Sequence, residues 1–189
     1  QGNELNSTTS GSQAYATNLD GNYSNNTKSF LYSPCFDLTS IEDPILKFNM
    51  AFDIEFDWDL LYMQYSTDLG QNWNVLGSAE SPNWYNSSRF SGDGVNEDCY
   101  NCIGGQWTGT NLDMTEYSYS LTELGVHNNI IFRFVFHTDQ YVTEEGVVID
   151  DFVINGTTLS TNSEDLINFA IYPNPSSNIF NIRLKNITS

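Results

Sequence analysis

The chain has 189 residues, of which 24 are acidic and 6 are basic, so its formal net charge at pH 7 is −18. This charge excludes a protein that binds nucleic acid by neutralising phosphates, and an aromatic content of 14% excludes a disordered chain. The sequence has no run of about 18 apolar residues, so we expect no membrane insertion.

The N-terminal half contains two predicted strands and a hairpin. Apolar and polar residues alternate over residues 46–56, as in a strand with one face on the core. Residues 59–66 form a second run, after which the turn residues 68–70 lead to Trp73. Residues 66–73 also match the Asp-box pattern S-x-D-x-G-x-x-W, in which the Asp side chain binds turn amides and the Trp packs beneath the hairpin. We therefore predict a structural role for this motif.

A long polar segment with aromatic residues follows the hairpin. It covers residues 77–110, and loops of this length are usually functional or disordered, while the aromatic content favours function. Planar rings with Asn and Asp nearby are the usual means of binding sugars. The residues that we expect to bind a glycan are Trp58, Trp84, Tyr85, Asn86, Arg89 and Trp107. The alternative that Trp84 and Tyr85 anchor the loop to the core stays open.

The same loop contains two of the three cysteines. Cys99 and Cys102 have CxxC spacing within a stretch rich in Gly and Asn, and not the strand–helix context of a redox motif, so a small loop disulfide is expected. A zinc site would require a further ligand from Cys35, His127 or His137. Because the number of cysteines is odd, disulfides are not the framework of the fold.

The C-terminal half contains two further strands and then an appendage. Residues 130–137 alternate Phe with other residues, and residues 147–154 are rich in β-branched side chains. Only residues 114–125 show a weak helical period, so the sequence predicts an all-β, two-sheet antiparallel β-sandwich. Residues 157–168 read as a polar linker, and residues 169–189 as a short β-type appendage.

Acidic residues recur at every second position before the second strand. Asp53, Glu55, Asp57 and Asp59 would share one face of an extended strand, and such a cluster requires solvent or a cation. Asp150 and Asp151 could complete the six to eight oxygen ligands that calcium usually takes. We therefore predict a structural calcium ion (Ca²⁺), with a solvated acidic face as the alternative.

Catalysis finds little support in the sequence. No spacing isolates a pair of carboxylates for glycoside hydrolysis. His127 and His137 are the two imidazoles, and neither a G-x-S-x-G nor an H-E-x-x-H pattern accompanies them. We therefore expect no catalytic residue in this chain, and any catalytic domain would precede it.

Five segments carry a resemblance to a known family, namely residues 33–38, 59–66, 83–86, 132–134 and 147–152. Together they resemble the MAM-like jelly-roll domains of secreted Bacteroidetes proteins. This resemblance implies a jelly-roll sandwich over residues 1–156, and it supports a structural calcium ion beside the last strand.

The appendage carries a second resemblance. The sequence Ile-Tyr-Pro-Asn-Pro at residues 171–175, followed by Phe-Asn-Ile at 180–182, looks like the start of a type IX secretion C-terminal sorting domain. It implies recognition by the type IX secretion machinery and a secreted or cell-surface location. From these observations we expect a non-catalytic carbohydrate-binding accessory module whose partner is a polysaccharide. The alternative is a protein-interaction, adhesion or spacer module attached to a secreted hydrolase such as a peptidase.

Overall fold

The computed structural model of the chain describes residues 5, 8–92, 99–158 and 169–170. Within these ranges the chain is built almost entirely from strands joined by turns. The elements are β1 (Tyr15–Ala16), β2 (Lys28–Phe36), β3 (Ile41–Asp53), β4 (Leu60–Ser66), β5 (Asn74–Val75), β6 (Thr110–Ser120), the 3-10 turn η1 (Thr122–Leu124), β7 (Ile130–His137), β8 (Gly146–Thr158) and β9 (Phe169–Ala170). No helix in the described part is long and apolar enough to cross a membrane.

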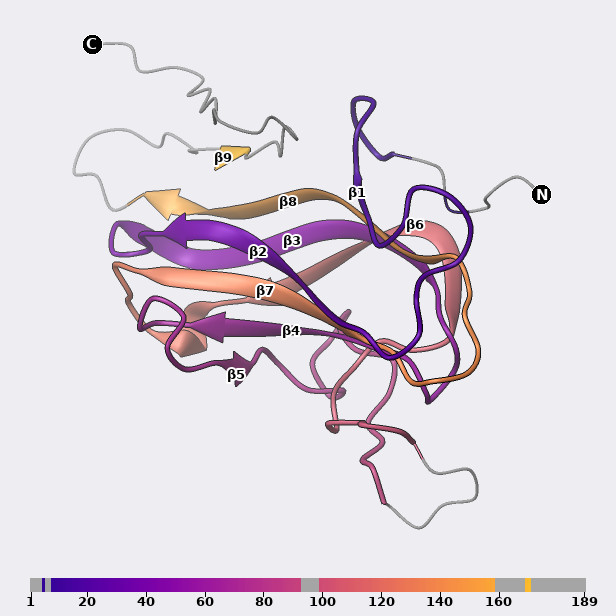
Figure 1. Cartoon of the computed structure of the whole chain (residues 1–189). Coiled ribbons are helices and arrows are strands. Elements are labelled where there is room, and N and C mark those ends of the chain that lie inside the picture. The colour runs from indigo at the N-terminus through magenta and orange to yellow at the C-terminus, as the bar shows by residue number, and fades with distance from the viewer. Residues whose placement is uncertain (1–4, 6–7, 93–98, 159–168, 171–189) are drawn as a thin grey trace.

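The strands form two antiparallel sheets that lie face to face (Figure 1). Sheet A has the order β1-β8-β3-β6, with β9 paired to the outer edge of β8. Sheet B has the order β2-β7-β4-β5. Eight strands arranged in two four-stranded layers with these crossovers form a jelly roll. The predicted all-β sandwich is therefore confirmed.

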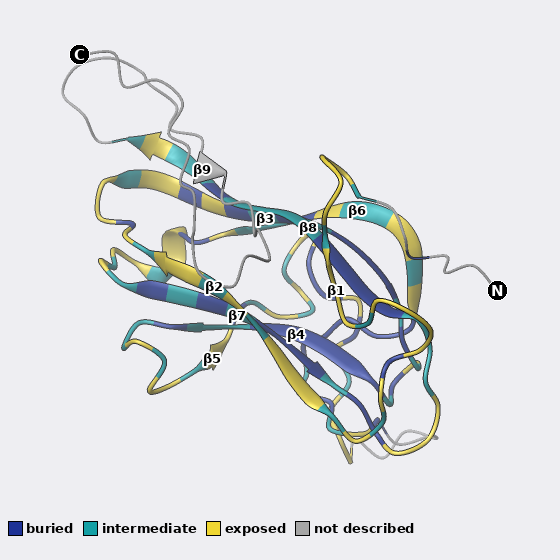
Figure 2. Ribbon diagram, turned by 45° about the horizontal axis from the view of Figure 1, so that its top comes forward, coloured by how far each residue is buried: buried dark blue, intermediate teal, exposed yellow. Residues whose placement is uncertain are grey.

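Large aromatic side chains fill the space between the sheets. Phe48 of β3 is fully buried, and its ring meets Phe134 of β7 edge to face, with centroids 4.8 Å apart. Because side chains alternate along a strand, every second residue of β3 and β7 lies in this core. Figure 2 shows buried positions along strands of both sheets, while much of β2 is exposed. Full burial of one such ring contributes about 1.5–3 kcal/mol.

Some boundaries differ from the sequence prediction. Strand β3 ends at Asp53, and the turn that follows contains Asp57, whose positive φ of 64° a strand does not allow. The weak helical pattern over residues 114–125 is mostly strand β6, followed by η1. Strand β8 continues to Thr158, so the predicted linker begins with two residues of the sandwich. Residues 171–189, with the sorting motif, lie outside the described residues.

Candidate functional site

The three large aromatic residues predicted to bind a glycan lie in the core. The exposed fractions are 3% for Trp84, 6% for Tyr85 and 0% for Trp107. The indole N–H of Trp84 donates to the Leu76 carbonyl at 2.9 Å, and that of Trp107 donates to the Trp84 carbonyl at 2.9 Å. A sugar cannot stack on a ring whose faces are buried. These residues hold the long loop against the sandwich, as the alternative interpretation proposed.

The other predicted glycan-binding residues are engaged within the same loop region. The Asn86 side chain donates to the Thr108 carbonyl at 2.9 Å and accepts from the Thr108 N–H at 3.0 Å, like a residue of a paired strand. Arg89 forms an ion pair with the buried Asp57. Trp58 is half-buried and stacks on Tyr100 with centroids 6.3 Å apart. The side chains of Asn86 and Arg89 therefore bind other parts of the loop region, and this stabilises the loop.

The CxxC pair also belongs to this structural arrangement. Cys99 and Cys102 form a disulfide, and both are buried. The Cys99 sulfur lies 3.6 Å from Asp57 Oδ1, so the disulfide packs on the carboxylate that Arg89 neutralises. Cys35 is exposed and forms no disulfide. The expected small loop disulfide is present, and it ties the loop to the turn between β3 and β4.

A cluster of three carboxylates lies at one end of the sandwich. Oxygen atoms of Glu55, Asp59 and Asp139 are all within 4.8 Å of one another. Asp59 and Asp139 are buried, with exposed fractions of 0% and 4%. The Tyr23 hydroxyl donates to Asp59 Oδ2, and the Asp139 N–H donates to Asp59 Oδ1 at 2.7 Å. Glu55 Oε2 is buried and has no hydrogen-bond partner among the described residues.

Burial and mutual repulsion disfavour the charged forms of these carboxylates. Burial raises the pKa of Asp59, and burial together with the charge of Asp139 raises the pKa of Glu55. Among the described residues, no basic side chain lies within 4.0 Å of these three carboxylates. Carboxylate oxygens are the hard ligands that calcium prefers. The donors fit a calcium ion, which would neutralise the cluster and give Glu55 Oε2 a partner.

The remaining predicted metal ligands do not join this cluster. Asp53 accepts a hydrogen bond from Thr110 at 2.8 Å, and Asp57 pairs with Arg89. Asp150 accepts three backbone N–H groups, two of them from the N-terminal segment, and Asp151 accepts from Ser10 and from Asn49 of β3. The expectation of one extended strand was wrong, because the chain turns after Asp53. Asp139 was not identified from the sequence.

A second candidate site lies on the outer surface of sheet B. The guanidinium of Arg133 lies 4.5 Å from the ring centre of Phe30 and 3.9 Å from that of Trp73. Tyr32 meets Trp73 edge to face at 5.7 Å, and Gln64 accepts two N–H groups of Arg133 at 2.9 and 2.6 Å. We call these five residues the aromatic face. Phe30 is 42% exposed and Tyr32 54% exposed.

Strand register assembles the aromatic face. Arg133 of β7 lies opposite Tyr32 of β2 and opposite Gln64 of β4, so all three side chains point to the same side of the sheet. The Asp-box hairpin adds Trp73, whose indole N–H donates to the Gly70 carbonyl at 3.0 Å. The motif therefore holds its turn, as predicted, and also presents a ring to the surface. One signal in the sequence could have indicated this face: Phe30 and Tyr32 stand at alternate positions, so on a strand they lie on the same side.

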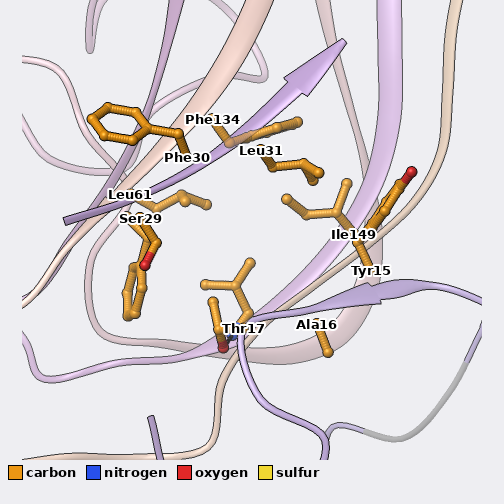
Figure 3. Close-up of a pocket in the computed structure, with 11 residues that line it drawn as sticks. Tyr15, Ala16, Thr17, Ser29, Phe30, Leu31, Leu61, Phe134 and Ile149 are labelled. Carbon is orange, nitrogen blue, oxygen red and sulfur yellow. Dashed lines mark hydrogen bonds between the residues drawn. The ribbon is translucent and has the colours of Figure 1, made fainter. Parts of the chain in front are cut away.

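A cavity opens between the edge strands β1 and β2. It has a volume of about 210 Å³ and is lined mainly by apolar side chains, including Leu31, Phe134 and Ile149. Tyr15 and Thr17 border it on the β1 side (Figure 3). The cavity is too apolar for a sugar, and it holds no titratable pair that would support catalysis.

Comparison with known proteins gives a limited result. No family model matches the chain. Over 150 residues, the chain is 26% identical to Bacillopeptidase F of Bacillus subtilis (strain 168). The matched region covers 79% of this chain but 8% of that protein. The chain is therefore similar to a small part of a much longer protein whose name describes a peptidase.

Proposed function

We propose that the chain is a non-catalytic, carbohydrate-binding accessory module of a secreted or cell-surface protein. The observation that carries this proposal is the aromatic face. Its exposed rings, Phe30 and Tyr32, lie on a rigid sheet beside Trp73. Aromatic rings with adjacent hydrogen-bonding groups, here Gln64 and Arg133, are suited to stacking on sugar rings and binding their hydroxyls.

The wider context supports an accessory role. The similarity to a small part of Bacillopeptidase F is consistent with a module attached to a hydrolase. The disulfide between Cys99 and Cys102 favours an oxidising, extracellular environment. The jelly-roll strand order agrees with the MAM-like resemblance, and export by the type IX secretion machinery remains the proposal that the motif at residues 171–175 supports.

The proposal is tested by binding to an array of polysaccharides. Trp73→Ala removes a ring of the aromatic face and should weaken binding about tenfold. Phe90→Ala is the matched control, because Phe90 is an aromatic residue that is 59% exposed and lies in the long loop. Equal loss in both variants, or no binding by folded wild-type protein across the array, would contradict the proposal.

Calcium is proposed as a structural ion bound by Glu55, Asp59 and Asp139. Its supporting observation is the buried Glu55 oxygen without a partner. Calcium in excess of chelator should raise the melting temperature of the wild-type protein. Glu55→Gln should abolish this shift, whereas Asp53→Asn, at an acid outside the cluster, should keep it. If Asp53→Asn abolished the calcium-dependent rise in melting temperature and Glu55→Gln preserved it, the ion would bind outside the cluster of Glu55, Asp59 and Asp139.

A second candidate function is protein interaction through the edge of β2. Thr138 N–H donates to the Thr27 carbonyl, so by alternation the backbone groups of Lys28, Phe30 and Tyr32 point away from β7. Such an edge accepts an added strand, and the neighbouring cavity would take one apolar side chain of an extended peptide. Ser29→Pro removes the Ser29 N–H, which is directed at β7. It leaves intact the outward-facing backbone groups of β2, which are the groups that an added strand would bind. Leu31→Trp fills the cavity and should block an added peptide.

A further inference from the structure

The acidic residues are distributed very unequally between the two sheets. Over their described spans, the strands β2, β7, β4 and β5 of sheet B contain no Asp or Glu. In contrast, β3, β6 and β8 of sheet A each carry two or more acids, including Asp53, Glu116 and Asp150. In a chain with 24 acidic residues, sheet B is a surface without carboxylates on its strands.

The basic residues show the opposite distribution. Lys47 is paired with Glu116, and Arg89 is paired with Asp57. Lys28 and Arg133, both on strands of sheet B, have no carboxylate within 4.0 Å among the described residues. Two cations without acidic partners therefore lie on the sheet that lacks acids, and one of them is the centre of the aromatic face.

Arg133 is held in a fixed orientation with part of its hydrogen-bonding capacity unused. It donates two N–H groups to Gln64 and one to the Tyr32 hydroxyl at 3.1 Å. A guanidinium has five N–H groups, so two remain. Stacking by Phe30 and Trp73 fixes the plane of the group, and a planar, oriented guanidinium suits a carboxylate or a sulfate.

Lys28 extends this arrangement along β2. Lys28, Phe30 and Tyr32 are alternate residues of one strand and are all exposed, so they share the outer surface. At about 3.4 Å per residue, Lys28 lies roughly 14 Å along the strand from Tyr32 and its neighbour Arg133. A linear chain lying on β2 would meet Lys28 and then the aromatic rings that surround Arg133.

We propose that the aromatic face binds an anionic polysaccharide, with sugar rings stacked on Phe30, Tyr32 and Trp73 and acidic groups bound by Arg133 and Lys28. This inference rests on the proposed carbohydrate-binding function and names its ligand class. The net charge of −18 does not oppose it strongly, because charges beyond a Debye length of about 8 Å are largely screened at physiological ionic strength. The strands of sheet B bring Lys28 and Arg133, but no Asp or Glu, to this surface.

The test compares polysaccharides that differ in their acidic groups. Polygalacturonate is compared with its neutral methyl ester, and heparin with chemically desulfated heparin, by calorimetry with the whole chain. We expect the more highly charged member of at least one pair to bind at least tenfold more tightly than its counterpart, and the pair that responds distinguishes carboxylate from sulfate. Equal binding within each pair would overturn the anionic specificity and leave carbohydrate binding intact. No binding to any polysaccharide by folded protein would overturn both proposals.

Variants locate the acidic group on the surface. Lys28→Gln should weaken anionic binding about three- to tenfold, and Arg133→Gln about 10- to 100-fold. Lys47→Gln, a cation of sheet A paired with Glu116, should leave binding unchanged. Because Arg133 also packs against two rings, the melting temperature of the Arg133→Gln variant must be compared with that of wild type. If Arg133→Gln does not fold, the exposed Lys28→Gln variant alone tests the assignment. Anionic binding that Lys28→Gln does not weaken, or that Lys47→Gln weakens equally, would overturn the assignment.

Discussion

Two tryptophans provide a test that separates the core from the proposed binding surface. Trp84 is 3% exposed, packs on Phe48, Tyr85 and Trp107, and donates to the Leu76 carbonyl. Replacing a buried Trp by Ala lowers the free energy of unfolding by about 3–5 kcal/mol, and the unpaired carbonyl adds about 1 kcal/mol. Single domains are stable by about 5–15 kcal/mol, so Trp84→Ala should lose a large part of the total stability.

Trp73 should behave differently. It is partly exposed and contributes a cation–π contact with Arg133, which is worth about 0.5–1 kcal/mol at an exposed site. With the loss of some packing, Trp73→Ala should lower the free energy of unfolding by about 1–2 kcal/mol. Urea unfolding followed by circular dichroism measures both values. A Trp84→Ala variant as stable as wild type, or a Trp73→Ala variant that loses more than Trp84→Ala, would refute this division of roles.

Three further changes have expected outcomes. Hydrogen bonds from Asn72 and Ser66 lower the pKa of Asp68 from 3.8 to about 2. The ionised Asp68 therefore stabilises the fold above its ordinary pKa, and this stabilisation is lost as the pH falls towards 2. In urea unfolding at decreasing pH, the difference in the free energy of unfolding between wild type and Asp68→Asn should shrink over this range. Gly77→Ala places a Cβ 2.8 Å from the Trp84 ring at a φ of 77° and should lower the free energy of unfolding by about 2–4 kcal/mol. Gly11→Ala, with a φ of 64° and open space, should cost clearly less, and equal effects would contradict the packing argument. Tyr23→Phe removes the hydrogen bond to the buried Asp59 and should cost about 1.5–3 kcal/mol, measured by thermal unfolding against Tyr15→Phe, whose phenol is on a partly exposed residue.

The candidate calcium site was partly predictable. Glu55 and Asp59 were identified because acidic residues recur before the second strand. Their separation from Asp53 and Asp57 depends on the turn that begins after β3, where Asp57 adopts a positive φ. Asp139 lies 80 residues after Asp59, and no local pattern connects the two. The third carboxylate of the cluster is brought there by the pairing of β4 with β7.

The loop aromatics show why composition alone wrongly predicted exposed rings. Trp84 and Trp107 stand in a polar segment, which predicts exposure. Each indole N–H donates to a backbone carbonyl inside the protein, so burial leaves neither of these two N–H groups without a partner. A sequence shows that a ring is surrounded by polar neighbours in the chain, but it does not show where the loop folds back.

By itself, the sequence determined the strands β3, β4, β7 and β8, the sandwich and the acidic charge, because alternation of apolar residues and residue counts are local properties of the chain. It did not determine the strands β2 and β6. It also determined the Asp-box turn and the Cys99–Cys102 disulfide, whose partners are close in sequence. The tertiary structure decided which side chains meet across strands. Tyr32 and Gln64 reach Arg133 through the register of β2 and β4 with β7, and register is set by the burial of whole strand faces, which is a property of the assembled core.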